Sequence, residues 1–162
     1  MAYIYPAPGV SGVQATLKIH RQSKTADATG LSIPALQDIT LNAANDVFTW
    51  TQLDTKSKLQ IATTATNSLT MNLVLDETTF FGTTGSGGTT AVTAGIFGLS
   101  SDKTLVEFDL YTGDTSEGTP GKIINGKGYI TGLAPTVSAD APVWVSPITI
   151  TVTGDYTISE GT

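Results

Sequence analysis

Apolar and polar residues alternate along several short stretches of the chain, and this alternation is typical of strands that bury one face. It is clearest from Thr104 to Tyr111, where three apolar residues share one face and two acids, Glu107 and Asp109, point out from the other. The other single strands predicted in this way are Val13–His20, Ala35–Leu41, Val47–Leu53, Lys122–Thr131, Val143–Val145 and Ile148–Thr153. Many short strands with turn signals between them predict a mainly β fold, a sandwich or a barrel.

A hairpin and one helix complete the predicted elements. Ser57–Ala65 and Ser68–Leu75 both have strand character, and Thr66-Asn67 supplies a turn between them. The helix is predicted over Thr89–Ser101, where apolar residues recur at helical spacing behind a threonine cap. Its glycines, Gly95 and Gly98, each cost about 1 kcal/mol relative to alanine, so this helix needs a sheet to pack against.

The chain is predicted to be one domain behind a short arm. Residues 1–12 carry Pro6, Pro8 and Gly9 and are expected to form an extended N-terminal arm, whereas residues 13–162 form the domain. Three polar stretches are expected to be loops, and the second should be the most flexible: Gln22–Ser32, Gly82–Gly88 and Thr112–Gly121.

Composition supports this picture and excludes several functions. Only 14% of the 162 residues are charged, so a surface rich in Thr, Ser, Gly and Asn must cover the domain. The net charge is −6 without any basic cluster, which argues against a protein that grips nucleic acid. The sequence has no cysteine and no apolar run that approaches the length of a membrane span, and the residues from Met1 to Pro6 are not expected to act as a secretory signal. We therefore expect synthesis in a cytoplasm, without membrane association.

Few residues offer chemistry. The one histidine, His20, falls on the polar face of a predicted strand and is expected to be a solvated surface residue. Glu107 and Asp109 are about 7 Å apart along their strand, a spacing that glycosidases also use, but alternation with core residues favours a solvated face. Asp76 and Glu77 are possible calcium ligands, although no EF-hand spacing accompanies them. No catalytic site, cofactor or metal is therefore expected.

Two further features have structural explanations. The glycines between Gly82 and Gly88 lack the spacing of a nucleotide-binding loop and are interpreted as a mobile loop. Trp50 and Trp144 could form a sugar-binding platform, but the core or a subunit interface is the preferred place for both.

The order of these elements resembles the tail-tube proteins of siphophages, a fold shared with contractile-tail tubes and type VI secretion tubes. The stretches that carry the resemblance are Gln14–Ile19, Val47–Asp54, Leu69–Asp76, the predicted helix leading into Thr104–Tyr111, Gly126–Leu133 and Pro147–Tyr156. The last is an aliphatic-threonine strand followed by Gly154-Asp155-Tyr156, much like the family's final strand.

The resemblance implies a sandwich or barrel with one flanking helix that forms hexameric rings stacked into a tube. It implies a virion tail protein, assembled in the host cytoplasm, whose partners are its own copies, the tape-measure protein and other tail proteins. Phage DNA would pass without specific binding, because six chains at −6 give a ring a charge of −36. The candidates for lumen-facing acids are Asp76, Glu77, Glu107 and Asp109. Polar loops such as Gln22–Ser32 and the N-terminal arm would bridge rings, ordering only on assembly.

Two other functions stay open. A β-sandwich that decorates a capsid or binds carbohydrate would expose aromatic residues on a concave face. A glycoside-cleaving enzyme would need two carboxylates across a cleft.

Overall fold

The computed structural model describes residues 4–5, 16–33, 36–52, 57–84, 91–115 and 118–161. The strands in these residues are β1 Ile4–Tyr5, β2 Thr16–Arg21, β3 Leu31–Ile33, β4 Leu36–Asn42, β5 Asn45–Trp50, β6 Leu59–Thr64, β7 Ser68–Val74, β8 Gly82–Thr84, β9 Ala91–Ala94, β10 Val106–Tyr111, β11 Asp114–Thr115, β12 Lys122–Leu133, β13 Thr136–Ser138 and β14 Ala141–Glu160. Two short helices, α1 Glu77–Phe81 and α2 Ile96–Ser101, complete the described elements.

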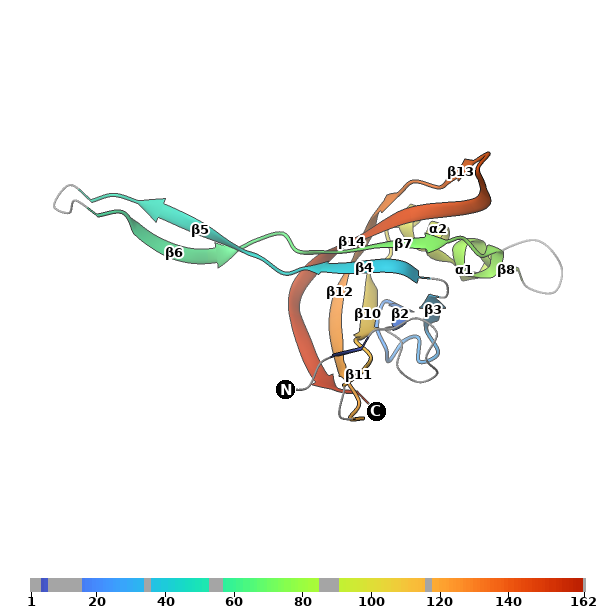
Figure 1. Ribbon diagram of the computed structural model, residues 1–162, viewed down its shortest axis with the longest axis horizontal. Coiled ribbons are helices and arrows are strands. Elements are labelled where there is room, and N and C mark those ends of the chain that lie inside the picture. The colour runs from blue at the N-terminus through green and yellow to red at the C-terminus, as the bar shows by residue number, and fades with distance from the viewer. Residues whose placement is uncertain are drawn as a thin grey trace.

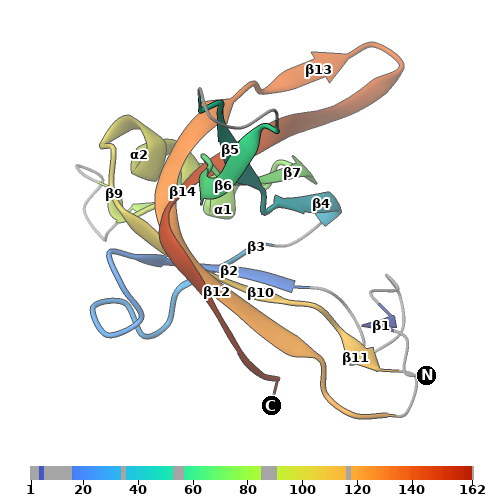
Figure 2. The ribbon, with the colours of Figure 1, turned by 90° about the vertical axis from the view of Figure 1, so that its left-hand side faces the viewer.

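One large antiparallel sheet dominates the molecule and curls on itself (Figures 1 and 2). Its order is β3-β2-β10-β12-β14-β7-β4, and β13 pairs with the first residues of β14. A flat sheet would hold the two edge strands, β3 and β4, about 29 Å apart, for six spacings of about 4.8 Å. Only two residues separate Ile33 from Leu36, which limits their Cα atoms to about 11 Å. The connectivity therefore forces the curled, half-barrel shape.

The core fills the inside of this curl. The alternating residues predicted to be buried are buried: Phe108 is completely buried on β10, as are Ile148 and Ile150 on β14. Phe80 from α1 and Ile96 and Leu99 from α2 join the same cluster, so both helices pack onto the sheet. Each such side chain contributes about 1.5–3 kcal/mol through burial.

A missing side chain allows a half-buried ring to pack against a core ring. A Cβ atom on Gly126 would lie 2.6 Å from Cζ of Phe108 and 3.2 Å from Cδ1 of Tyr156. The register between β12 and β14 shifts beside Gly126, and Gly154 in the irregular stretch has φ +82°. The shift lets Tyr156 pack its ring 6.4 Å from that of Phe108, at 64°.

The hairpin predicted between Ser57–Ala65 and Ser68–Leu75 is wrong. β6 pairs with β5, and β7 pairs with β4 and β14. The strands β4–β5 and β6–β7 form one long hairpin whose outer half, the β5–β6 ribbon, leaves the sheet and projects from the body (Figure 1). Asn67 marks the departure point instead of a turn, because its side-chain oxygen accepts a bond from the Ala44 N–H across the hairpin.

The predicted helix is shorter than expected, and a second helix was not predicted. Residues 91–94 form β9, because β-branched residues favour a strand there, and positions 89–90 lie outside the described residues. α2 begins only after Gly95, where a Cβ atom would lie 2.5 Å from the carbonyl oxygen of Phe80. α1 has five residues, too few for a periodic pattern, and Asp76 caps it by accepting a bond from the Thr79 N–H.

The two closing strands predicted around Pro147 are one strand of twenty residues, β14. β12 pairs with β14 only as far as Ile148, and β13 pairs with it as far as Val145. Pro147 falls between these two pairings, so the edge of β14 that faces β12 and β13 has no partner strand at this residue. Such a place tolerates the missing N–H of proline.

The predicted loops also take definite positions. Residues 22–30 fold back over the polar face of their own sheet, so the expectation that this loop orders only on assembly is wrong. Ile4 and Tyr5 of the N-terminal arm pair with β11. Three predicted segments lie outside the described residues: the rest of the arm, residues 13–15 of the first strand and the glycines at 85–88.

Candidate assembly surfaces

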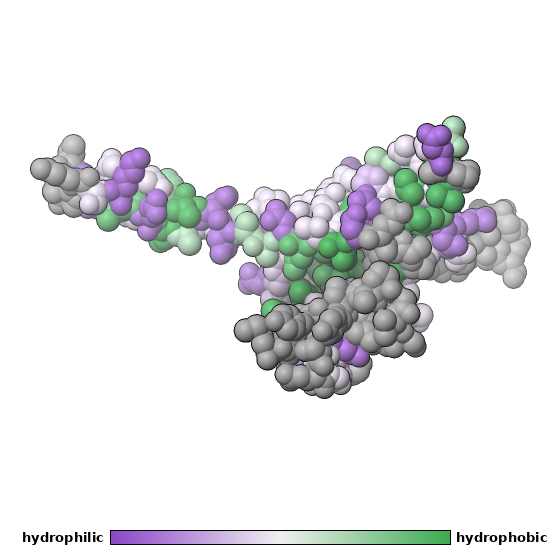
Figure 3. Space-filling view, in the orientation of Figure 1, coloured by the Kyte–Doolittle hydropathy of each residue, from purple (hydrophilic) through white to green (hydrophobic). Residues whose placement is uncertain are grey.

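The β5–β6 ribbon is amphipathic. Its register places Phe48 opposite Ile61 and Trp50 opposite Leu59, so these four apolar side chains share one face. Phe48 is 59% exposed and Ile61 55%, while the Phe48 and Trp50 rings stack with centroids 5.9 Å apart. Figure 3 shows apolar residues along the ribbon, away from the body. An apolar face so exposed marks a contact surface.

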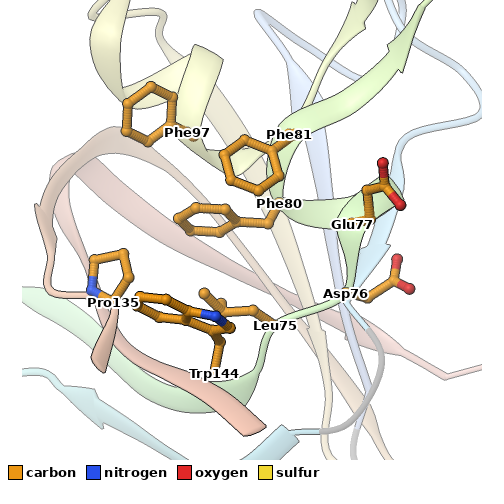
Figure 4. Close-up of a pocket in the computed structure, with 8 residues that line it drawn as sticks. All are labelled: Leu75, Asp76, Glu77, Phe80, Phe81, Phe97, Pro135 and Trp144. Carbon is orange, nitrogen blue, oxygen red and sulfur yellow. The ribbon is translucent and has the colours of Figure 1, made fainter. Parts of the chain in front are cut away.

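A groove on the body is the second exposed apolar surface (Figure 4). It has a volume of about 540 Å³. We call it the aromatic groove; its lining residues are Leu75, Asp76, Glu77, Phe80, Phe81, Phe97, Pro135 and Trp144.

Three elements shape the aromatic groove. α1 supplies Phe80 and Phe81, α2 supplies Phe97, and the start of β14 supplies Trp144. The Phe81 and Phe97 rings lie 6.1 Å apart and both contact Phe80, whose burial anchors the cluster in the core. Phe81, Phe97 and Trp144 are each more than half exposed, so the groove is an open aromatic surface.

The groove also places two of the predicted lumen acids. Asp76 and Glu77 are exposed at one side of it, where Asp76 is the N-cap of α1. Figure 4 shows both carboxylates directed away from the aromatic rings, so they are placed to meet a cationic group at the rim of the groove.

The other two acids, Glu107 and Asp109, lie in a polar network on the opposite face of the sheet. Asn125 Nδ2 donates to Glu107 Oε1 and to Asp109 Oδ1, both at 2.8 Å. Glu107 Oε2 accepts the Lys24 N–H at 3.1 Å, and Lys24 Nζ lies 2.6 Å from Asp109 Oδ2. Glu107 is only 9% exposed, so the expectation that it stands on a solvated face is wrong.

His20 belongs to this network and is buried, not a surface residue as predicted. Its Nδ1 donates to the Asp27 carbonyl oxygen at 2.7 Å, and its Nε2 lies 3.4 Å from Asp109 Oδ2. The alternation placed His20 correctly on the polar face. It did not show that residues 22–30 fold over that face.

The network lowers the pKa of its acids. Burial alone would raise the pKa of Glu107 and of Asp109. The hydrogen bonds from Asn125 and Lys24, together with nearby positive charge, outweigh burial and leave both pKa values below their usual range. The pKa of Asp27 is also lowered, chiefly by the bond from the Arg21 N–H. The three carboxylates thus hold the loop onto the sheet in their charged form.

These contacts favour packing over chemistry. A catalytic triad requires its histidine to contact a nucleophile, whereas His20 contacts a carboxylate and a main-chain carbonyl. Glu107 and Asp109 share one hydrogen-bond donor beneath a loop, whereas a glycosidase holds its acids across an open cleft. Among the described residues, no three His, Cys, Asp or Glu side chains gather as metal ligands. Neither described helix has the length and apolar character needed to cross a bilayer.

Most of the aromatic groove was missed by sequence reasoning. Trp144 was assigned to the core or an interface, and it lies in this exposed groove. Phe80, Phe81 and Phe97 were not singled out, although the adjacent phenylalanines after a capping aspartate were an available signal.

No family model and no curated protein sequence matches the chain. Its fold, however, is similar to that of solved tail and tube proteins. A chain from the tail of an empty gene transfer agent particle, refined with C6 symmetry, matches with a TM-score of 0.58 and 13% identity over 88% of this chain and 95% of that one.

Two other structures show the same similarity. A chain from the SPP1 tail tube matches with a TM-score of 0.54 and 15% identity, over 96% of this chain and 80% of that one. A chain from the sheath–tube complex of PVC, an extracellular contractile injection system, matches with a TM-score of 0.52 and 13% identity over 96% and 93%. These matches confirm the tail-tube-like fold that the sequence predicted.

Proposed function

We propose that this chain is the structural subunit of a phage-type tail tube, and that it assembles into stacked hexameric rings. The observation that carries the proposal is the fold similarity to tail and tube chains over nearly the whole molecule. In this proposal the protein resides in the virion tail, after assembly in the host cytoplasm. Its partners are its own copies, a tape-measure protein and other tail proteins, and its role is structural instead of enzymatic.

The exposed surfaces support self-assembly. The β5–β6 ribbon and the aromatic groove are different patches of one chain, and contacts between different patches generate rings or open polymers. The free edges of β3 and β4 favour assembly for the same reason, because unpaired edges are covered when neighbours pack against them.

The proposal assigns the polar face of the large sheet to the lumen. Thr70, Thr149 and Thr151 lie on this face and present hydroxyl groups, whereas Glu107 and Asp109 lie on it beneath residues 22–30. The lysines of this face, Lys18, Lys24 and Lys127, lie beside Glu107 or Asp109, and the charge of −6 per chain would oppose adhesion of DNA. Asp76 and Glu77 lie at the aromatic groove and receive another role below.

Electron microscopy of the purified protein over a concentration series tests the proposal, with sedimentation velocity alongside. We expect six-fold rings or hollow tubes above a threshold concentration. A protein that stays monomeric at every concentration would refute the proposed function.

A carbohydrate-binding module is the second candidate, because Trp144, Phe81 and Phe97 form an open aromatic surface beside two acids. Sugar rings stack on such surfaces. Calorimetric titration with oligosaccharides separates the two: saturable sugar binding that Trp144→Ala abolishes, by a protein that forms no rings, would favour this function over the tube.

A further inference from the structure

We infer that the apolar face of the β5–β6 ribbon of one chain docks in the aromatic groove of a second copy. The inference rests on the proposed self-assembly and names the two surfaces that meet.

The ribbon needs a partner to be stable in the shape that it has. A two-stranded hairpin is at best marginally stable in water by itself. Phe48, Trp50, Leu59 and Ile61 line one face of the ribbon, and Phe48 and Ile61 stay more than half exposed beside the described part of the chain. Covering that face would remove the exposed apolar area and would favour the extended form over an unfolded loop.

The groove of the same molecule cannot serve as this partner. The ribbon projects at one end of the long axis, whereas α1 and α2 lie toward the other (Figure 1). The groove that receives a ribbon must therefore belong to another copy. Because the two patches differ, each copy offers one of each, and the contact propagates through an assembly.

The two surfaces complement each other in chemistry. Both combine aromatic with aliphatic side chains, and an aromatic residue that enters a pocket is a common anchor of protein interfaces. Lys58 is exposed next to Leu59 at the outer end of the ribbon, and Asp76 and Glu77 are exposed beside the groove.

The charges also set the orientation. Asp46 lies on the apolar face at the base of the ribbon, about 17 Å from the level of Lys58 at strand rise. Two copies of an acidic chain repel each other overall, and like charges at a contact are costly. The outer end with Lys58 therefore points toward Asp76 and Glu77, and the base with Asp46 points away from them.

A charge-reversal series tests the contact without touching the core, because Lys58 and Glu77 are both exposed. Lys58→Glu should raise the threshold concentration for assembly about tenfold, since it places like charges together. Adding Glu77→Lys should return the threshold to near the wild-type value. The matched control is Lys103→Glu, an exposed position with the same change in net charge, and thermal unfolding verifies that all variants fold.

Cross-linking tests proximity directly, because the chain contains no native cysteine. Mixed Lys58→Cys and Glu77→Cys chains should form a disulfide-linked pair, whereas Lys58→Cys mixed with Thr153→Cys should not. Thr153 is also exposed, and it pairs with Lys127 on the polar face of the large sheet. In the double variant Lys58→Cys/Glu77→Cys, a link within one chain but not between chains would show that the ribbon folds back, and it would overturn the inference.

The outcomes separate this inference from the proposed function. Tubes that form without the cross-link, or a Lys58→Glu variant that behaves like Lys103→Glu, overturn the docking and leave the tube in place. Cross-linked chains that never form rings or tubes support the docking and overturn the tube. A chain that does not associate at all overturns both.

Discussion

The carboxylate of Glu107 is one of the contacts that hold residues 22–30 to the sheet, and Glu107→Gln tests it. Glu107 accepts one bond from Asn125 Nδ2 and one from the Lys24 N–H. A glutamine has one acceptor oxygen where glutamate has two, so its amide group would face one of these donors. The variant therefore leaves one buried donor without an acceptor.

The size of the effect follows from the burial of the site. A buried polar group that loses its partner costs about 1–3 kcal/mol. Unfolding temperatures of proteins of this size fall by about 2–4 °C per kcal/mol, so we expect a decrease of roughly 2–12 °C. The matched control is Asp38→Asn, because Asp38 also accepts from an asparagine, Asn72, but is exposed. Exposed substitutions of this kind usually stay within about 0.5 kcal/mol.

Thermal unfolding followed by far-ultraviolet circular dichroism measures the unfolding temperature of both variants, and hydrogen exchange at the Lys24 amide reports on the loop. We expect a lower midpoint and faster exchange for Glu107→Gln only. The difference from wild type should narrow as the pH falls from 4.5 through the lowered folded-state pKa of Glu107, because acid then removes the charge that the hydrogen bonds stabilise. Equal stability of Glu107→Gln and Asp38→Asn would refute the argument that burial sets the cost.

Three further predictions concern the sheet, the network and the first helix. Gly128→Ala should lower the free energy of unfolding by about 1–3 kcal/mol in denaturant titrations, because its Cβ would lie 2.3 Å from the main-chain oxygen of Thr151. The control Gly132→Ala should lower it clearly less, because the nearest atom to its Cβ would be a side-chain atom at 3.2 Å; equal losses of stability would contradict this. Because the pKa of Asp109 is lowered in the folded state, its contribution to the free energy of unfolding should be complete above pH 3.8 and should decline as the pH falls through the folded-state pKa. In an acid titration, the free energy of unfolding of Asp109→Asn should therefore decline less than that of wild type. Asp76→Ala removes the cap of α1 and should cost about 0.5–2 kcal/mol in thermal unfolding, whereas Asp76→Asn should keep most of the stability.

Local patterns predicted the elements better than their pairing. The residues buried along β10 and β14 follow from a period of two, which a sequence displays directly. The partner of β6 does not, because Thr66-Asn67 looks like a turn and the sequence carries no measure of which strand lies alongside. The curled shape likewise depends on β3 and β4 ending at opposite edges of one sheet.

Exposure of polar groups was the least predictable property. His20 and Glu107 stand on the polar face of their strands, as predicted, yet both are buried. Their burial comes from a loop, residues 22–30, whose own sequence has no apolar pattern to indicate that it packs on anything.

The sequence by itself determined a mainly β domain of low charge with one face of each central strand in the core, because alternation and composition act residue by residue. Only the tertiary structure decided which surfaces stay open. The ribbon and the aromatic groove depend on which strands leave the sheet and on where α1, α2 and β14 meet, and contacts between residues far apart in the chain fix both.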